Sequence, residues 1–343
     1  MPDRTRELAQ RRRNHNQRRR GALAGAAVAA AALIGAVTPL VTPRAATAVT
    51  QPAATHASVA LPARGAFSYP WYPEAWSQSG FDPATHYRPT PGYYSSTAVM
   101  AEHVKALLYG HFAFDVSSWW GRASKEDARF GPLLAAAHGT ALKVAPYYEA
   151  EGNATSTTPG SPNPSAAQIT ADLDYLAAHY TADPSYLWIA GKPAVFVYGD
   201  GSDGCDMAAR WARGNAAATE RFYVVLKVFS GYGSCASQPD NWHQYGPAVA
   251  ESAQGAHSFT ISPGFWKFGE STPRLARSTS RWATDVTDMN CSSAALRLVT
   301  TFNEWGEGTA VESATAWATA SGYGRYLDVL HNRPGCPTAG TSP

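Results

Sequence analysis

The chain has 343 residues, of which 45% are hydrophobic and 12% aromatic, a composition typical of a folded domain with a sizeable core. Its formal charge of +2 depends on the first 48 residues, which hold nine arginines and two acids, so residues 49–343 carry a net charge of −5. This negative balance argues against a nucleic-acid or anionic-membrane partner, because phosphate binding needs clustered Lys and Arg on the folded surface.

Residues 1–48 have the three parts of an export signal peptide. The arginine-rich run RRRNHNQRRR precedes an uncharged stretch at residues 21–41, and the tripeptide ATA at residues 46–48 offers a small-residue cleavage site. We predict cleavage after Ala48, and therefore a secreted, extracellular protein. The alternative is a membrane anchor through residues 21–41, but this stretch is mostly Ala and Gly and contains Pro39, which makes it weakly hydrophobic.

Residues 49–64 are rich in Ala, Pro and Thr, which predicts a flexible linker. From residue 65 to residue 337, short β-rich runs alternate with Ala-rich helical patterns, and residues 338–343 form a tail. The predicted strands, in chain order, are residues 65–72, 111–120, 141–149, 194–199, 222–229, 240–245, 257–265 and 297–305, the sixth having the weakest pattern. The predicted helices are residues 95–108, 124–138, 165–180, 205–218 and 273–286.

This alternation predicts an α/β fold, a (β/α)8 TIM barrel over residues 65–337, because each pair of parallel strands needs a crossover. An open doubly wound sheet is the alternative. In a barrel, the chemistry lies at the C-terminal ends of the strands, and aromatic and carboxylate side chains gather there in this sequence. Such a set indicates a sugar site, since sugar rings stack on aromatic faces and their hydroxyls need fixed polar partners. Any single aromatic residue could equally belong to the core.

Four cysteines lie at residues 205, 235, 291 and 336. An exported chain meets oxidising conditions, so two disulfides are expected rather than a metal site. Of the three possible pairings we favour Cys205 with Cys235 and Cys291 with Cys336.

No cofactor and no metal are expected. The run GDGSDG at residues 199–204 matches the GxGxxG pattern of dinucleotide-binding loops, but Asp200 and Asp203 would repel a pyrophosphate. The sequence contains neither HExxH nor GxSxG, which leaves metalloprotease and serine-esterase functions without support.

The run TTFNEWGEGTAVESA at residues 300–314 places Glu304 and Glu307 three positions apart. In one strand they would face opposite sides, and the β-branched and aromatic residues before them disfavour a helix. We predict that the strand ends near Glu304 and that Gly306 and Gly308 let a loop turn Glu307 back toward it. Two carboxylates facing one sugar bond could act as acid and as nucleophile or base. The alternative is that Glu307 is a solvated loop charge.

This run resembles the pattern F/W-N-E-W-H-E-G-T-x-I-E-x-A of glycoside hydrolase family 99, the endo-α-1,2-mannosidases and mannanases. Weaker matches follow the family's order: PTPGYYSS at residues 89–96, VSSWWG at 116–121, LKVAPYYE at 142–149, GKPAVFVY at 191–198 and SPGF at 262–265. The resemblance implies a (β/α)8 glycoside hydrolase that cleaves α-linked glycans with retention, with mannan as the first choice.

Carried over by the resemblance, Glu304 would assist attack of the sugar's own 2-hydroxyl on C1, giving a 1,2-anhydro sugar. Glu307 would be the acid and then the base for water. The expected substrate contacts are Asn303, Trp119, Trp120, Tyr148 and Glu149, to which the strand-end pattern adds Tyr72 and Tyr245.

The sequence departs from the family at two places. Gly306 stands where the family has His, and the segment at residues 71–88 is shorter than the family's loop. These departures leave two alternatives open: a hydrolase of a non-mannose glycan, and a non-catalytic carbohydrate-binding barrel protein. The expected partner is a polysaccharide or oligosaccharide, bound by a monomer with no stable membrane partner after cleavage.

Overall fold

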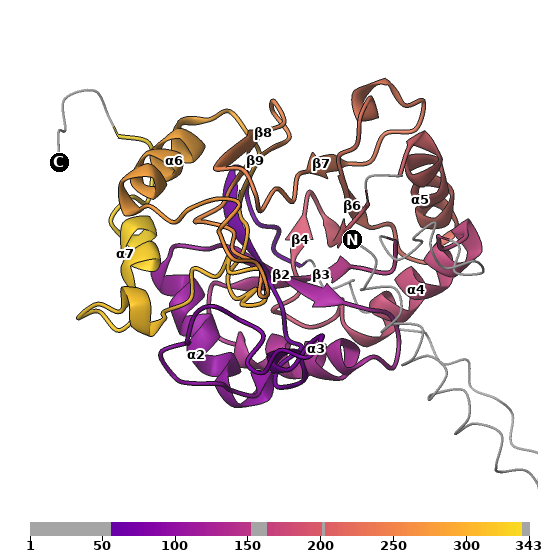
Figure 1. The fold of residues 1–343 in the computed structure, drawn as a ribbon. Helices are drawn as coiled ribbons and strands as arrows, with labels where there is room; N and C mark the ends of the chain where they lie inside the picture. Colours follow the sequence, from indigo (N-terminus) through magenta and orange to yellow (C-terminus); the bar gives the residue numbers. More distant parts are fainter. Residues whose placement is uncertain (1–55, 152–162, 201–202, 338–343) are drawn as a thin grey trace, which may run out of the picture. The chain divides into compact units, whose positions relative to one another are not determined.

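The computed structural model describes residues 56–151, 163–200 and 203–337 (Figure 1). The predicted signal peptide, residues 49–55 of the predicted linker and the tail at residues 338–343 lie outside the described residues, and the last two residues of the predicted linker belong to the first strand. None of the described helices is both long and apolar enough to cross a membrane.

The eight predicted strands are all present. They are β1 (Ala63–Ser68), β2 (Phe114–Trp119), β3 (Lys143–Tyr148), β5 (Lys192–Val197), β6 (Tyr223–Lys227), β7 (Asn241–His243), β9 (Ser258–Ile261) and β10 (Leu296–Val299). Their order in the sheet follows the chain from β1 to β7 on one side, and on the other side β1 pairs with β10 and β10 with β9, all in parallel.

The pairing of the first strand with the last distinguishes this sheet from an open doubly wound one. Ala63 lies opposite Leu296 in the β1–β10 ladder, while Gly65 lies opposite Phe114 in the β1–β2 ladder. A side chain at position 65 would meet the Phe114 ring, because an added Cβ would lie 2.0 Å from it. Because β1 pairs with β2 on one side and with β10 on the other, the sheet curls into a (β/α)8-like barrel, and the predicted fold class is confirmed.

The barrel wall is irregular between β7 and β9. No backbone ladder joins these two strands in the described chain, and side-chain hydrogen bonds link them instead. His257 Nδ1 lies 2.8 Å from Asn241 Oδ1, and Thr260 Oγ1 donates to Gln244 O at 2.9 Å.

Two short antiparallel strands were not predicted: β8 (Glu251–Ala253) pairs with β9, and β4 (Trp188–Ile189) pairs with β5.

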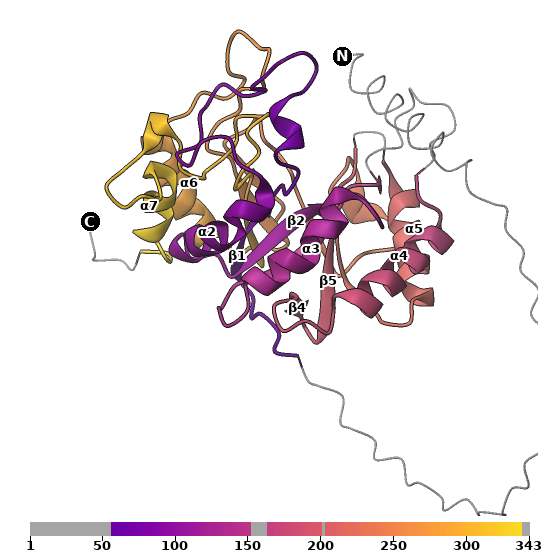
Figure 2. The same ribbon diagram turned by 90° about the horizontal axis from the view of Figure 1, so that it is seen from below.

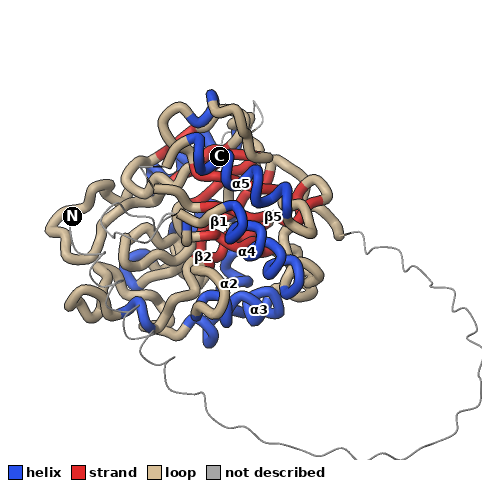
Figure 3. The backbone as a smooth tube through the Cα atoms, turned by 90° about the vertical axis from the view of Figure 1, so that its right-hand side faces the viewer, coloured by secondary structure: helices blue, strands red, loops and turns tan. Residues whose placement is uncertain are grey.

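The helices lie on the outside of the strands (Figures 2 and 3). They are α2 (Ser96–Tyr109), α3 (Lys125–Ala136), α4 (Ala166–His179), α5 (Cys205–Ala217), α6 (Thr279–Cys291) and α7 (Arg325–His331). The first five were predicted. α6 begins later than expected, because Ser278 caps it by accepting from Arg281 N, while Leu275 forms a β-bridge with Phe265. α7 was not predicted.

The core has two layers, which follow from the alternation of side chains along each strand. Inward-facing residues such as Phe67, Tyr147 and Phe196 fill the barrel, and outward-facing residues pack against the helices. His243 is fully buried in the inner layer, where its Nε2 donates to Val197 O at 3.0 Å. Burial lowers the pKa of His243 to about 3, so this side chain is neutral at physiological pH.

Both predicted disulfides are present. Cys205–Cys235 joins the first residue of α5 to the residue after the short turn Tyr232–Ser234, with 5.3 Å between the Cα atoms. Cys291–Cys336 joins the last residue of α6 to the segment after α7, with 4.7 Å between the Cα atoms. The described residues contain no free cysteine.

Candidate active site

The loop that carries Glu304 and Glu307 follows β10 at the C-terminal end of the barrel. The strand ends at Val299, five residues earlier than predicted. The loop then closes on itself: Glu304 N donates to Thr301 Oγ1 at 2.8 Å, and Thr309 N donates to Glu304 O at 3.2 Å. These contacts hold a segment that has no helix or strand of its own.

Glycine is needed at two positions of this loop for different reasons. Gly308 has a φ of +65°, and an added Cβ would lie 2.6 Å from the carbonyl oxygen of Trp266, so both its conformation and its surroundings require glycine. Gly306 has no such φ. A Cβ there would lie 2.9 Å from Glu304 Oε1 and 3.4 Å from the Phe268 ring, so Gly306 leaves room for these two side chains.

Tyr245 contacts Glu307. Its hydroxyl donates to Glu307 Oε2 at 2.8 Å. Burial raises the pKa of Tyr245 well above its usual value, and the charges of Glu307 and, less strongly, Glu304 raise it further. Glu304 is buried and Glu307 is half-buried, so Glu307 is not a fully solvated loop charge.

Asn303 and Tyr72 hold this loop against the end of β1. Asn303 Oδ1 accepts from Tyr69 N at 2.8 Å, and its Nδ2 donates to Tyr69 O at 3.2 Å. Tyr72 donates its hydroxyl to Asn303 O at 3.1 Å and accepts from Trp305 N at 3.2 Å. Both side chains are buried. Asn303 and Tyr72 thus make protein contacts that position the loop, and their contacts with a sugar stay a prediction.

Glu149 and Trp120 follow β3 and β2 at the same end of the barrel. Glu149 is buried, and its charge, after burial itself, raises the pKa values of Tyr69 and Tyr147. Trp120 is half-buried. Glu149 and Glu307 thus lie near the same two tyrosines.

Trp119 and Tyr148, two of the predicted sugar contacts, lie on the helix side of their strands. Trp119 is fully buried and its Nε1 donates to Asp127 Oδ1 at 2.9 Å, while Tyr148 donates to Asp172 Oδ2 at 2.9 Å. Both therefore pack in the outer layer, against α3 and α4. The physical reason is the alternation along a strand, which turns neighbouring side chains to opposite faces.

The sequence reasoning missed two tyrosines. Tyr147 is the inward neighbour of Tyr148, and its ring centroid lies 4.8 Å from that of Phe67 and 6.4 Å from that of Tyr245. Tyr69 stacks on Trp71 with 4.4 Å between ring centroids. The alternation of the predicted strands was the available signal, because Phe67 and Tyr69 share one face of β1.

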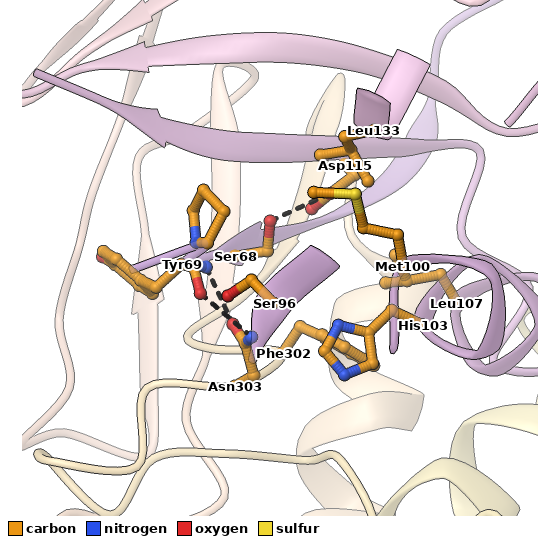
Figure 4. Close-up of a pocket in the computed structure, with 11 residues that line it drawn as sticks. Ser68, Tyr69, Ser96, Met100, His103, Leu107, Asp115, Leu133, Phe302 and Asn303 are labelled. Carbon is orange, nitrogen blue, oxygen red and sulfur yellow. Dashed lines mark hydrogen bonds between the residues drawn. The ribbon is translucent and has the colours of Figure 1, made fainter. Parts of the chain in front are cut away.

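A small cavity lies behind the barrel wall, between β1, β2 and α2 (Figure 4). Ser68 donates its hydroxyl to Asp115 Oδ2 at 2.9 Å, and Asp115 Oδ1 has no protein partner among the described residues. His103 of α2 also lines the cavity, and its Nε2 lies 3.1 Å from Glu312 Oε1. Burial raises the pKa of Asp115 to about 7, although the Ser68 hydroxyl and the nearby His103 oppose the rise.

The substitution Asp115→Asn is expected to stabilise the protein in alkaline solution. Because the folded state raises this pKa from 3.8 to about 7, the carboxyl stabilises the fold below pH 3.8 and loses that effect as the pH rises through 7. The loss approaches roughly 4 kcal/mol at pH 8, and Asn removes it. Urea unfolding at pH 5 and pH 8 measures the change. A variant less stable than the wild type at pH 8 would contradict the prediction.

The described residues contain no group of three or more His, Cys, Asp or Glu side chains arranged to hold a metal ion. The fold and the cluster around Tyr245 define a (β/α)8-type barrel with three glutamates at the C-terminal ends of its strands.

Comparison with known proteins gives structural likeness only. No protein-family model and no curated protein sequence matches the chain. The endo-α-mannosidase of glycoside hydrolase family 99 from Bacteroides thetaiotaomicron, in complex with Bis-Tris propane, is similar to it with a TM-score of 0.60 and 18% identity over 79% of this chain and 95% of that one. A second structure of the Bacteroides thetaiotaomicron endo-α-mannosidase gives a TM-score of 0.57 at 18% identity, over 78% and 95%. Likeness at this identity establishes the fold.

Proposed function

We propose that this protein is an exported glycoside hydrolase that cleaves α-linked glycans with retention, with mannan as its first candidate substrate. The observation that carries the proposal is that Glu304 and Glu307 both lie on the loop after β10, at the C-terminal end of the barrel, where Tyr245 donates to Glu307. The fold shared with the endo-α-mannosidase supports it. The disulfides fit an oxidising, extracellular environment.

In the proposed reaction, Glu304 accepts the proton of the sugar 2-hydroxyl while that oxygen attacks C1. The bond from C1 to the leaving oxygen breaks, and Glu307 donates a proton to the leaving group, which gives a 1,2-anhydro sugar. Glu307 then removes a proton from water as the water oxygen attacks C1, and the 2-oxygen recovers its proton from Glu304. Two inversions at C1 give net retention.

The surroundings of the pair suit a sugar ring. The stacked Tyr69 and Trp71, together with Trp120, offer apolar faces near the mouth, while Glu149 offers a hydrogen-bond acceptor for hydroxyls. Gly306 is the position that bears most directly on sugar specificity, since it leaves open the space beside the Glu304 carboxylate.

A panel of α-linked glycans tests the proposal, with α-mannans and α-glucans as its two main arms. Release of reducing ends from an α-mannan is the expected result. Cleavage of a non-mannose glycan alone would assign a different substrate to the same site. Binding of a glycan with no cleavage of any panel member would contradict the enzyme and favour a carbohydrate-binding barrel protein.

The substitution Tyr245→Phe is expected to lower kcat about tenfold with little change in stability, because it removes one hydrogen bond to Glu307 and keeps the ring. Kinetics on the cleaved glycan and thermal unfolding check the two parts of the prediction. Tyr109→Phe is a matched control, since Tyr109 also donates to a carboxylate, Asp328, on the outer helices. Equal losses of kcat in both variants would contradict a role for Tyr245.

A further inference from the structure

The loop from Glu304 to Ala310 receives its support from the segment between β9 and α6. Trp266 N donates to Glu307 O at 2.9 Å, and Phe268 N donates to Gly306 O at 2.9 Å. Farther along the same segment, Arg277 Nη2 donates to Gly308 O at 2.8 Å and to Ala310 O at 2.7 Å. One guanidinium nitrogen therefore holds two carbonyls of the chain immediately after Glu307.

The guanidinium of Arg277 is enclosed by aromatic rings. Its Cζ lies 4.0 Å from the centroid of Trp317, 4.7 Å from that of Tyr326 and 5.0 Å from that of Tyr87. These contacts are within the range of cation–π interactions. Tyr87 lies before α2, Trp317 lies before α7, and Tyr326 lies within α7. Arg277 therefore joins these three parts of the chain to the glutamate loop.

The environment of Arg277 is costly for a cation. Burial lowers the pKa of Arg277, and the neighbouring phenols of Tyr326 and Tyr87 oppose this fall. Room for the side chain also depends on Gly264, because an added Cβ there would lie 2.5 Å from Arg277 Cγ. An apolar side chain in this place would avoid the desolvation of a charge but could donate to neither carbonyl.

We infer that Arg277 is a positioning residue that fixes the Glu304–Glu307 loop by clamping the carbonyls of Gly308 and Ala310 from an aromatic cage. The inference rests on the proposed function for its effect on catalysis. Its effect on the loop itself is independent of any activity. Lysine is expected to replace the clamp poorly, because its compact ammonium lacks the planar guanidinium that packs against the aromatic cage.

Arg64 provides a matched control. Arg64 is buried where Arg277 is half-buried, and it likewise donates to backbone carbonyls, with Nη1 2.7 Å from Gly110 O and Nη2 2.9 Å from Arg333 O. However, Arg64 lies near the start of β1, at the end of the barrel opposite the candidate active site. A merely structural role predicts the same behaviour for both residues.

The test compares Arg277→Ala and Arg277→Lys with Arg64→Ala in the full chain. Hydrogen exchange of the amides at residues 304–311 is expected to become at least tenfold faster in both Arg277 variants and to stay unchanged in Arg64→Ala. On the glycan that the wild type cleaves, kcat is expected to fall roughly 10- to 100-fold in the Arg277 variants. Guanidinium chloride at non-denaturing concentration should restore part of the kcat of Arg277→Ala and leave that of Arg64→Ala unchanged.

Unchanged exchange in the loop of a folded Arg277 variant would overturn the clamp, as would a kcat equal to that of the wild type. If Arg277→Ala does not fold, Arg277→Lys carries the same comparison, because it retains the charge and most of the volume. Absence of any glycan cleavage by the wild type would count against the proposed function, while the exchange measurement would still decide whether the clamp exists.

Discussion

Replacing Glu307 by Gln is expected to reduce glycan turnover by a factor of about 10³ or more, because Gln cannot donate and recover the proton that the leaving group and water require. Glu304→Gln is expected to have an effect of similar size, since the amide cannot accept the proton of the attacking hydroxyl. Both substitutions keep the size of the side chain, so we expect the glycan to bind with nearly wild-type affinity. Initial rates and calorimetric binding on the same glycan measure the two effects.

Glu102→Gln is the control for this pair. Glu102 lies on α2, is largely exposed and forms an ion pair with Lys105 at 2.7 Å, so its loss should leave turnover unchanged. If Glu307→Gln kept turnover within tenfold of the wild type while folded, the assignment of Glu307 as the acid would be wrong. The same result for Glu304→Gln would remove the proposed role of Glu304.

Trp305→Ala is expected to have the second largest effect, on stability and activity together. Trp305 lies between the two glutamates in the sequence and is fully buried, its Nε1 donates to Tyr94 Oη at 3.0 Å, and its ring stacks on Trp317. Truncating a buried Trp lowers the free energy of unfolding by about 3–5 kcal/mol. Because the flanking loop would also lose its anchor, we expect turnover to fall even at temperatures where the variant is folded.

Trp211→Ala separates these two effects. Trp211 on α5 is equally buried, and its Nε1 donates to Glu151 Oε2 at 2.9 Å, remote in sequence from the glutamate loop. We expect a similar loss in urea-unfolding free energy but an unchanged kcat at low temperature. A Trp305→Ala variant that matched Trp211→Ala in both measurements would show that Trp305 acts only as core.

The fold could be predicted from the sequence because each strand has its own local signal. β-Branched and aromatic residues marked most of the strands, the three-residue strand β7 having the weakest pattern, and the spacing of Ile169, Leu173 and Leu176 marked one face of α4. The start of α6 could not be predicted from periodicity, because a β-bridge between Leu275 and Phe265 occupies its expected first turn. Such long-range pairing depends on the closed barrel.

The site was harder to predict because a strand end presents side chains to two different layers. Trp119 and Trp120, like Tyr147 and Tyr148, are neighbours with opposite directions, and residue type alone does not distinguish them. Applying the alternation would have selected Tyr147. The contacts of Arg277 had no sequence signal, since its carbonyl partners lie more than thirty residues away.

The most direct test of the central claim is a proton NMR time course of the wild-type protein acting on an α-linked mannan. We predict new reducing-end signals that appear first as the α-anomer, because Glu304 and Glu307 would act in two inverting steps. A glycan that binds but stays intact over the time course would contradict hydrolysis, and first release of the β-anomer would contradict retention.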